Sequence, residues 1–404
     1  MQAELRPLSR RYDVVVANPP YMGAKNMNSW LSGWVKKYYA DVKGDLFSCF
    51  MVRNSGMGAD HAQMGFMTPY VWMFIGTYEK LRRFVIEQNT ITSLIQLEYS
   101  GFAGATVPIC TFTLQKGKVV GYKGGYIRLS DFPGADQQAP RALEALADPG
   151  CGWFYRADAD GFGAIPGSPI AYWASESIME AFRMSEPLRK IAPTLQGLAT
   201  GDNDRFLRCW WEVSSEKLKY DCRCLNEALD SDYKWFPMNK GGGYRKWFGN
   251  NETVLAFDQE NYNALLQSGN HLPSRELYFK EALTWGMITS SKFSMRLNGC
   301  GFIFSNAGLA CIAGDHETSL YLLGLMNSAV ASAALSFIAP TMNYTNGDVG
   351  KCPVRSSPVK KNKVGALSSE CIDIAVTDWD SFEVSWDYSR HPLLPGMSKK
   401  DGLK

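Results

Sequence analysis

One stretch near the N-terminus strongly limits what this chain of 404 residues can fold into. Tyr12-Asp13-Val14-Val15-Val16-Ala17 runs directly into Asn18-Pro19-Pro20-Tyr21. Three consecutive valines favour a strand buried on both faces, as in a parallel sheet. The two prolines end that strand, because each fixes φ and lacks an N–H donor. The sequence therefore predicts a stiff loop at the carboxyl end of a strand, which is where open α/β sheets bind their ligands.

The loop residues suit the methylation of an exocyclic amine. Such an amine is a poor nucleophile, since its lone pair is delocalised into the ring. The side-chain oxygen of Asn18 and the backbone carbonyl of Pro19 would accept its two hydrogens and stabilise the positive charge that develops during attack. Tyr21 would stack on the face of the planar substrate. The same loop also suits the amide nitrogen of a glutamine side chain, so nucleic acid and protein both remain possible substrates.

Composition narrows the class of protein. Hydrophobic residues make up 46% of the chain and charged residues 20%, which is an ordinary globular balance. The net charge is only +2, so any nucleic-acid surface must be a local patch. The ten cysteines have no metal-ligand spacing, which favours free thiols in a reducing cytoplasm and no metal site. No signal peptide is recognised, and the uncharged residues 320–339 are interpreted as a buried helix, not a membrane span.

Helical and strand patterns alternate downstream of the loop. The expected helices cover 29–40, the segment that follows Asp45 as N-cap, and 78–88, and the expected strands cover 65–68, 91–99 and 106–115. The third helix is amphipathic, and Arg82 is assigned to its solvent face. This alternation is typical of the second half of a doubly wound α/β sheet closed by an antiparallel hairpin. The Gly- and Pro-rich residues 117–168 are interpreted as a connector.

Three segments resemble motifs of the N6-adenine DNA methyltransferases, which use S-adenosylmethionine. Asn18 to Tyr21 resembles their motif IV, and residues 43–50 and 100–115 resemble motifs V and VIII of the γ class. The resemblance implies that Asp45 and Phe50 help to bind the cofactor. It also implies that Phe102 and Tyr21 hold a flipped adenine between them. The structural alternatives are a plain helix cap at Asp45, a core position for Phe50 and an exposed turn for Phe102.

The cofactor site of such an enzyme is expected to be incomplete in this chain. A Rossmann-like methyltransferase binds its cofactor at a glycine-containing loop after the first strand, with an acidic residue ending the second. The residues from Met1 to Arg11 carry neither feature, and Gly241-Gly242-Gly243 is not followed by a helical pattern. We therefore expect a fragment whose upstream half, with most of the S-adenosylmethionine site, is missing.

A second region interleaves aromatic and basic residues. Candidate phosphate-binding residues there are Arg205, Arg208, Lys240, Arg245 and Lys246. Each alone is explained equally well as an ordinary solvated charge, whereas the group favours DNA. Gly201-Asp202-Asn203-Asp204 is interpreted as a tight turn.

The resemblance extends beyond the catalytic motifs. Residues 197–206, 322–328 and 347–354 resemble the target-recognition domains of type IIG restriction-modification enzymes. With residues 165–173 and 386–392, nearly the whole chain resembles the adenine methyltransferases of BREX phage-defence systems. That resemblance implies duplex DNA as the partner and makes other phage-defence proteins candidate partners.

We therefore predict an α/β chain: the C-terminal half of a Rossmann-like methyltransferase sheet followed by an α+β target-recognition domain. The expected boundaries are 1–185 for the partial catalytic domain with its connector, 186–355 for target recognition, and 356–404 for a truncated basic segment. The expected function is site-specific transfer of a methyl group from S-adenosylmethionine to N6 of adenine, with this fragment alone inactive. The alternatives are a non-catalytic DNA-binding specificity fragment and a protein glutamine N5-methyltransferase.

Overall fold

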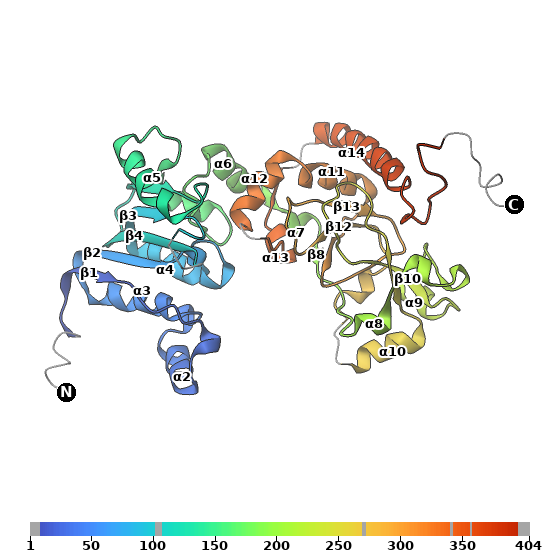
Figure 1. Ribbon diagram of the computed structural model, residues 1–404, viewed down its shortest axis with the longest axis horizontal. Coiled ribbons are helices and arrows are strands. Elements are labelled where there is room, and N and C mark those ends of the chain that lie inside the picture. Colours follow the sequence, from blue (N-terminus) through green and yellow to red (C-terminus); the bar gives the residue numbers. More distant parts are fainter. Residues whose placement is uncertain (1–8, 102–106, 269–271, 340–341, 356–357, 395–404) are drawn as a thin grey trace. The chain divides into compact units, whose positions relative to one another are not determined.

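The computed structural model describes residues 9–101, 107–268, 272–339, 342–355 and 358–394. These residues form two compact units, which divide the chain into Met1–Arg183 (unit 1) and Met184–Lys404 (unit 2) (Figure 1).

Unit 1 is built on one mixed sheet whose strands lie in the order β1-β2-β4-β3-β5-β6. β1 runs parallel to β2 and β3 runs parallel to β5, whereas the other neighbours are antiparallel. Its strands are β1 (Tyr12–Ala17), β2 (Gly58–Pro69), β3 (Asn89–Gln96), β4 (Ile109–Lys116), β5 (Lys123–Arg128) and β6 (Phe154–Asp158). Its α-helices are α2 (Ser29–Tyr38), α3 (Leu46–Met57), α4 (Glu79–Gln88), α5 (Ala135–Ala147) and α6 (Glu176–Met184). The predicted alternation and the β3–β4 hairpin are confirmed.

The prediction that β1 is buried on both faces is wrong for the described chain. Val14 is 62% exposed and Val16 is 77% exposed, because β1 is an edge strand paired only with β2. The two valines project from the same side of the strand, since side chains alternate between its faces. Consecutive β-branched residues specify the extended conformation, whereas burial depends on what covers each face.

The solvent-facing assignment of Arg82 is also wrong. The Arg82 side chain is buried, and its guanidinium makes hydrogen bonds with three backbone carbonyls. Nη1 donates to Trp72 O and Ile75 O, both at 2.8 Å, and Nε and Nη2 donate to Gly167 O at 2.9 and 2.7 Å. Burial lowers the Arg82 pKa to about 10, so the group keeps its charge at neutral pH. Arg82 thus ties the segment after β2 to residues far along the chain.

The stretch expected to be a connector continues the fold instead. β5 joins the sheet beside β3, β6 pairs with β5, and α5 lies between them in the sequence. A Cβ at Gly124 would lie 2.5 Å from the Ile91 carbonyl oxygen and 3.2 Å from the Tyr126 ring. The glycine that suggested a loop is therefore required by close approach of neighbouring strands.

Unit 2 contains two four-stranded sheets, ordered β14-β10-β11-β9 and β13-β12-β15-β8, and the pair β16-β7. Its strands are β7 (Glu186–Pro187), β8 (Thr194–Leu195), β9 (Leu207–Cys209), β10 (Trp235–Asn239), β11 (Thr253–Ala256), β12 (Ala282–Gly286), β13 (Arg296–Asn298), β14 (Ile303–Phe304), β15 (Gly308–Cys311) and β16 (Pro353–Val354). Its helices are α7 (Leu188–Ile191), α8 (Asn203–Phe206), α9 (Leu225–Leu229), α10 (Gln259–Gln267), α11 (His316–Met326), α12 (Ala329–Ile338), α13 (Asn346–Val349) and α14 (Pro358–Trp379).

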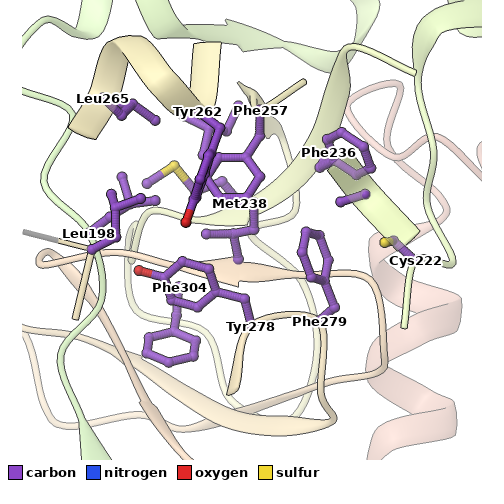
Figure 2. Packing of buried hydrophobic residues seen from close by; sticks show 14 of the residues in the cluster. Leu198, Cys222, Phe236, Met238, Phe257, Tyr262, Leu265, Tyr278, Phe279 and Phe304 are labelled. Atoms are coloured by element: carbon purple, nitrogen blue, oxygen red, sulfur yellow. The ribbon is translucent and has the colours of Figure 1, made fainter. Parts of the chain in front are cut away.

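One aromatic core joins the two larger sheets of unit 2. Phe236 and Met238 from β10 pack with Phe304 from β14 and with Tyr278 and Phe279 (Figure 2). The predicted α+β character of this region is confirmed. α14, within the segment predicted to be a basic extension, packs against α11: a Cβ at Gly324 would lie only 2.6 Å from the Ser368 hydroxyl oxygen.

The uncharged segment forms two helices where one was predicted. Asn327 lies at the break between them. Its Oδ1 accepts from Met295 N at 3.0 Å and its Nδ2 donates to Met295 O at 2.9 Å. Ser328 then caps α12 by accepting from Ala331 N. In the described part of the chain no single helix is long and apolar enough to cross a membrane; α11 and α12 pass that test only together, as a pair bent by 73°.

Candidate active site

The Asn18 to Tyr21 loop follows β1 at its carboxyl end, as the sequence predicts. Pro19 is buried, whereas Asn18, Pro20 and Tyr21 are exposed. The Tyr21 hydroxyl donates to Asn18 Oδ1 at 3.1 Å and lies 3.2 Å from the Met67 carbonyl oxygen on β2. Since a hydroxyl has one hydrogen, these two acceptors share it. The tyrosine thereby links the asparagine amide to the neighbouring strand.

The Tyr21 ring packs against a buried aromatic residue. It makes a T-shaped contact with the buried Phe47, with ring centroids 6.5 Å apart. Partial burial raises the Tyr21 pKa above its ordinary value, so the phenol stays neutral and remains a donor at physiological pH. An anchored ring with exposed surface is suited to stacking on a planar group.

Two Tyr21 variants should separate stacking from positioning. Tyr21→Phe keeps the ring but removes the hydrogen bond to Asn18, so we expect methyl transfer to fall by about ten-fold, the equivalent of one hydrogen bond. Tyr21→Ala also removes the stacking surface and should cost about a hundred-fold, because stacking on one base contributes 1–3 kcal/mol or so. Single-turnover rates measure both effects. Equal losses in the two variants would contradict a separate role for the ring.

Asp45 contacts the backbone of the residue that follows the loop. It is the N-cap of α3, and its Oδ1 accepts from Phe47 N at 3.3 Å and from Met22 N at 2.9 Å. Burial raises the Asp45 pKa, and these backbone hydrogen bonds oppose the rise. The structure therefore confirms that Asp45 caps a helix, α3. Asp45 also fixes the chain directly after Tyr21.

The other two candidate residues of unit 1 are Phe50 and Phe102. Phe50 is exposed on α3, where Phe47, Cys49 and Met51 are buried instead. The alternative of a core position for Phe50 is therefore wrong, and its ring is accessible to a ligand. Phe102 lies outside the described residues.

Sequence reasoning overlooked Tyr70, which follows the end of β2. Its pKa is raised by burial and by the nearby Tyr99, Glu98 and Cys110. Since β2 and β3 both run antiparallel to β4, their carboxyl ends lie at the same edge of the sheet. The signal was present: an aromatic residue directly after the strand-ending Pro69.

Three of the five basic candidates remain available in unit 2. An open cleft of about 580 Å³ is lined by Asn203, Arg208 and Lys240, among others. Lys240 Nζ donates to Asn203 Oδ1 at 3.2 Å, and burial lowers the Lys240 pKa. Arg205 is exposed, with its guanidinium 4.9 Å from the Phe206 ring centroid. The segment predicted to be a tight turn thus contributes Asn203 to a cleft that carries basic side chains and also the acidic Asp204 and Glu212.

The other two candidates are engaged within the fold. Arg245 forms an ion pair with Asp378 at 2.8 Å and lies over the Trp379 ring, 5.0 Å from its centroid. Lys246 Nζ donates to the Asn327 carbonyl at 2.7 Å. Both anchor the loop after β10. Among the described residues no group of His, Cys, Asp or Glu is arranged to hold a metal ion.

Comparison with known proteins gives related sequences over nearly the whole chain. Residues 4–102 match the family model of the Eco57I restriction-modification methylase. The adenine-specific methyltransferase PglX of Lacticaseibacillus casei (strain Zhang) is 34% identical over 98% of this chain and 33% of its own length. The adenine-specific methyltransferase BrxX of Escherichia coli O9:H4 (strain HS) is 35% identical over 96% of this chain and 31% of its own length. The chain therefore spans about a third of these curated relatives.

Solved structures share the fold at low identity. The type IIL restriction-modification enzyme MmeI, solved in complex with DNA, has a TM-score of 0.58 at 9% identity and covers 93% of this chain and 50% of its own. The type ISP enzyme LlaGI, solved with a DNA substrate mimic, has a TM-score of 0.53 at 11% identity and covers 93% of this chain and 36% of its own. The fold is thus shared with these restriction-modification enzymes. The sequence is similar to the PglX and BrxX adenine-specific methyltransferases.

Proposed function

We propose that this chain carries the target-binding part of a site-specific DNA methyltransferase that acts on N6 of adenine, in phage defence or restriction-modification. The observation that supports it best is the loop geometry: Asn18 Oδ1 is oriented by the Tyr21 hydroxyl, at 3.1 Å, beside the carboxyl end of β2. The relatives named adenine-specific methyltransferases favour adenine over glutamine as the substrate. Other phage-defence proteins remain candidate partners by the BREX resemblance.

The loop would act through hydrogen bonds already in place. A carbonyl oxygen has two lone pairs, so Asn18 Oδ1 can accept from Tyr21 and from one amine hydrogen at once. The Pro19 carbonyl would accept the second hydrogen. Both acceptors stabilise the positive charge that grows on the nitrogen as it attacks. The Tyr21 ring, with Phe102, would hold the flipped base by stacking.

S-adenosylmethionine, when bound, supplies an electrophilic methyl group. The exposed Phe50 ring would pack against the planar adenine ring of that cofactor, and Asp45 would set the position of α3 beside it. A carboxylate whose Oδ1 already accepts two backbone hydrogen bonds is suited to positioning. We propose these two residues as the contribution of this chain to the cofactor site.

Unit 2 would select the DNA sequence. In this assignment residues 1–185 belong to catalysis and 186–355 to target recognition, and residues 356–404 support the latter through α14. The residues that would neutralise phosphates are Arg205, Arg208 and Lys240. The loop after β10 would be held in place by Arg245 and Lys246.

Substitution should separate these two roles. Lys240→Gln removes a cation from the cleft, so we expect weaker duplex binding and a salt dependence reduced by about one unit in the slope of log K against log salt. Arg245→Gln should leave that slope unchanged and lower stability instead, because its partners are Asp378 and Trp379. Fluorescence anisotropy and thermal unfolding, measured on both variants, test the contrast. A reduced slope for Arg245→Gln with unchanged stability would contradict it.

Product analysis tests the proposal. The protein as its organism makes it is incubated with labelled S-adenosylmethionine and duplex DNA, and the DNA is digested to nucleosides. We expect the label in N6-methyladenine. Label in glutamine of a protein substrate, with none in DNA, would favour the alternative enzyme. Duplex binding with no transfer to either substrate would favour the non-catalytic specificity module.

A further inference from the structure

α2 presents an aromatic face to solvent. Trp30, Trp34 and Tyr38 recur every fourth residue and therefore lie along one side of the helix. They are 73%, 41% and 58% exposed, whereas Val35 is the buried residue of the helix. The rings of Trp34 and Tyr38 lie 5.3 Å apart and form a continuous surface. Exposed contiguous apolar surface of this kind marks an interaction site.

The segment that carries α2 starts and ends at the candidate active site. Ala24 N donates to Gly44 O at 3.0 Å, Leu46 N donates to Met22 O at 3.1 Å, and Gly23 bridges Asp45. Residues 24–44, which we call the α2 protrusion, are therefore closed at their base between Tyr21 and the Asp45 cap. The chain from Gly23 to Ser29 can span at most about 20 Å. In Figure 1, α2 stands clear of the sheet of unit 1.

The charge of the α2 protrusion identifies the class of partner. Its charged residues are four lysines and one aspartate: Lys25, Lys36, Lys37, Lys43 and Asp41. Asp41 pairs with Lys80, outside the protrusion. Lys37 extends over the Tyr38 ring, 5.1 Å from its centroid, and so belongs to the aromatic face. Among the described residues none of the four lysines has a carboxylate within ion-pair distance. A basic and aromatic surface fits an anionic, stackable partner better than it fits a second copy of this chain.

We propose that the α2 protrusion contacts the DNA duplex next to the target adenine, an inference that rests on the proposed function. A base flipped onto Tyr21 brings the flanking duplex to the base of the protrusion. Lys36 and Lys37 neutralise phosphates there, and Trp30, Trp34 and Tyr38 pack against sugars and against bases unstacked by the flip. The protrusion thus adds a DNA contact in unit 1 that is independent of the cleft around Lys240.

Two pairs of substitutions test this contact in the protein as its organism makes it. With a fluorescent duplex titrated from 50 to 300 mM salt or so, Lys36→Gln with Lys37→Gln should lower the slope of log K against log salt by about two. Trp30→Ala with Trp34→Ala should weaken binding by about ten-fold or more with the slope unchanged, because stacking carries little charge. The control pair is Tyr122→Ala with Lys123→Gln, exposed at the start of β5, and it should bind like wild type.

The outcomes distinguish this inference from the proposed function. If wild type binds duplex and methylates adenine while both α2 pairs bind like the control, this inference alone is overturned. Loss of oligomers in the tryptophan pair with unchanged DNA affinity would overturn it too, and would assign the face to a second copy. If wild type neither binds duplex nor methylates it, both fail. The lysine pair should leave the helix intact, which far-UV circular dichroism checks, so its result holds even if the tryptophan pair unfolds α2.

Discussion

Asn18→Ala should lower the rate of methyl transfer by about a hundred- to a thousand-fold, the usual effect of removing one pre-organised polar group that stabilises developing charge. Duplex affinity should stay within about two-fold, because Asn18 is exposed and its Oδ1 accepts from Tyr21 and, in the proposed complex, from the reacting amine. Asn18→Asp keeps an oxygen in the same place and should retain more activity than Asn18→Ala. Single-turnover rates with saturating cofactor give the comparison.

The control for this experiment is Asn263→Ala on the exposed surface of α10, which removes only a hydrogen bond with Gln259. It should transfer methyl groups at the wild-type rate. An Asn18→Ala protein that is folded, binds duplex and remains as fast as this control would show that the loop oxygen has no part in the reaction.

Arg82→Met should be the most destabilising substitution on α4. It leaves the carbonyl oxygens of Trp72 and Gly167 without the Arg82 donor, whereas Ile75 O still accepts from Tyr78 N at 3.0 Å. Each buried unsatisfied acceptor costs roughly 1–3 kcal/mol. We expect a loss of about 3–5 kcal/mol in the free energy of unfolding, or about 10 °C in the melting temperature of unit 1. Denaturant unfolding followed by circular dichroism measures the loss.

Arg83→Met is the matched control, one residue along the same helix. It removes only an exposed pair with Glu79 at 2.8 Å, so the expected loss is about 0.5 kcal/mol or less. Similar losses in the two variants would mean that the guanidinium bonds of Arg82 contribute nothing beyond surface charge.

The sequence predicted the local features of unit 1 well. Asn18-Pro19-Pro20-Tyr21 specifies its own turn, since two prolines restrict the backbone without help from distant residues. Asp45 likewise caps α3 through a contact only two residues away. The alternation of helices and strands followed from the periodicity of apolar residues.

The errors came from contacts between residues far apart in the sequence. Nothing near Arg82 reveals that the Gly167 carbonyl will reach its guanidinium, so a charged residue at that position is assigned to solvent by default. From the sequence alone, Gly124 is assigned to a loop, because nothing near it shows that the Ile91 carbonyl lies against it. Arg245 is likewise predicted to be a free cation, because its partner Asp378 lies far along the chain, on α14.

In the proposed function, the Asn18 loop takes part in the methylation of adenine at a defined DNA sequence. The most direct test is to map N6-methyladenine across the genome of a host that makes the protein and of the same host with Asn18→Ala. We predict one recognition sequence modified at nearly every occurrence with wild type and unmodified with the variant. A genome without any such sequence, or one that is modified equally in both strains, would contradict the claim.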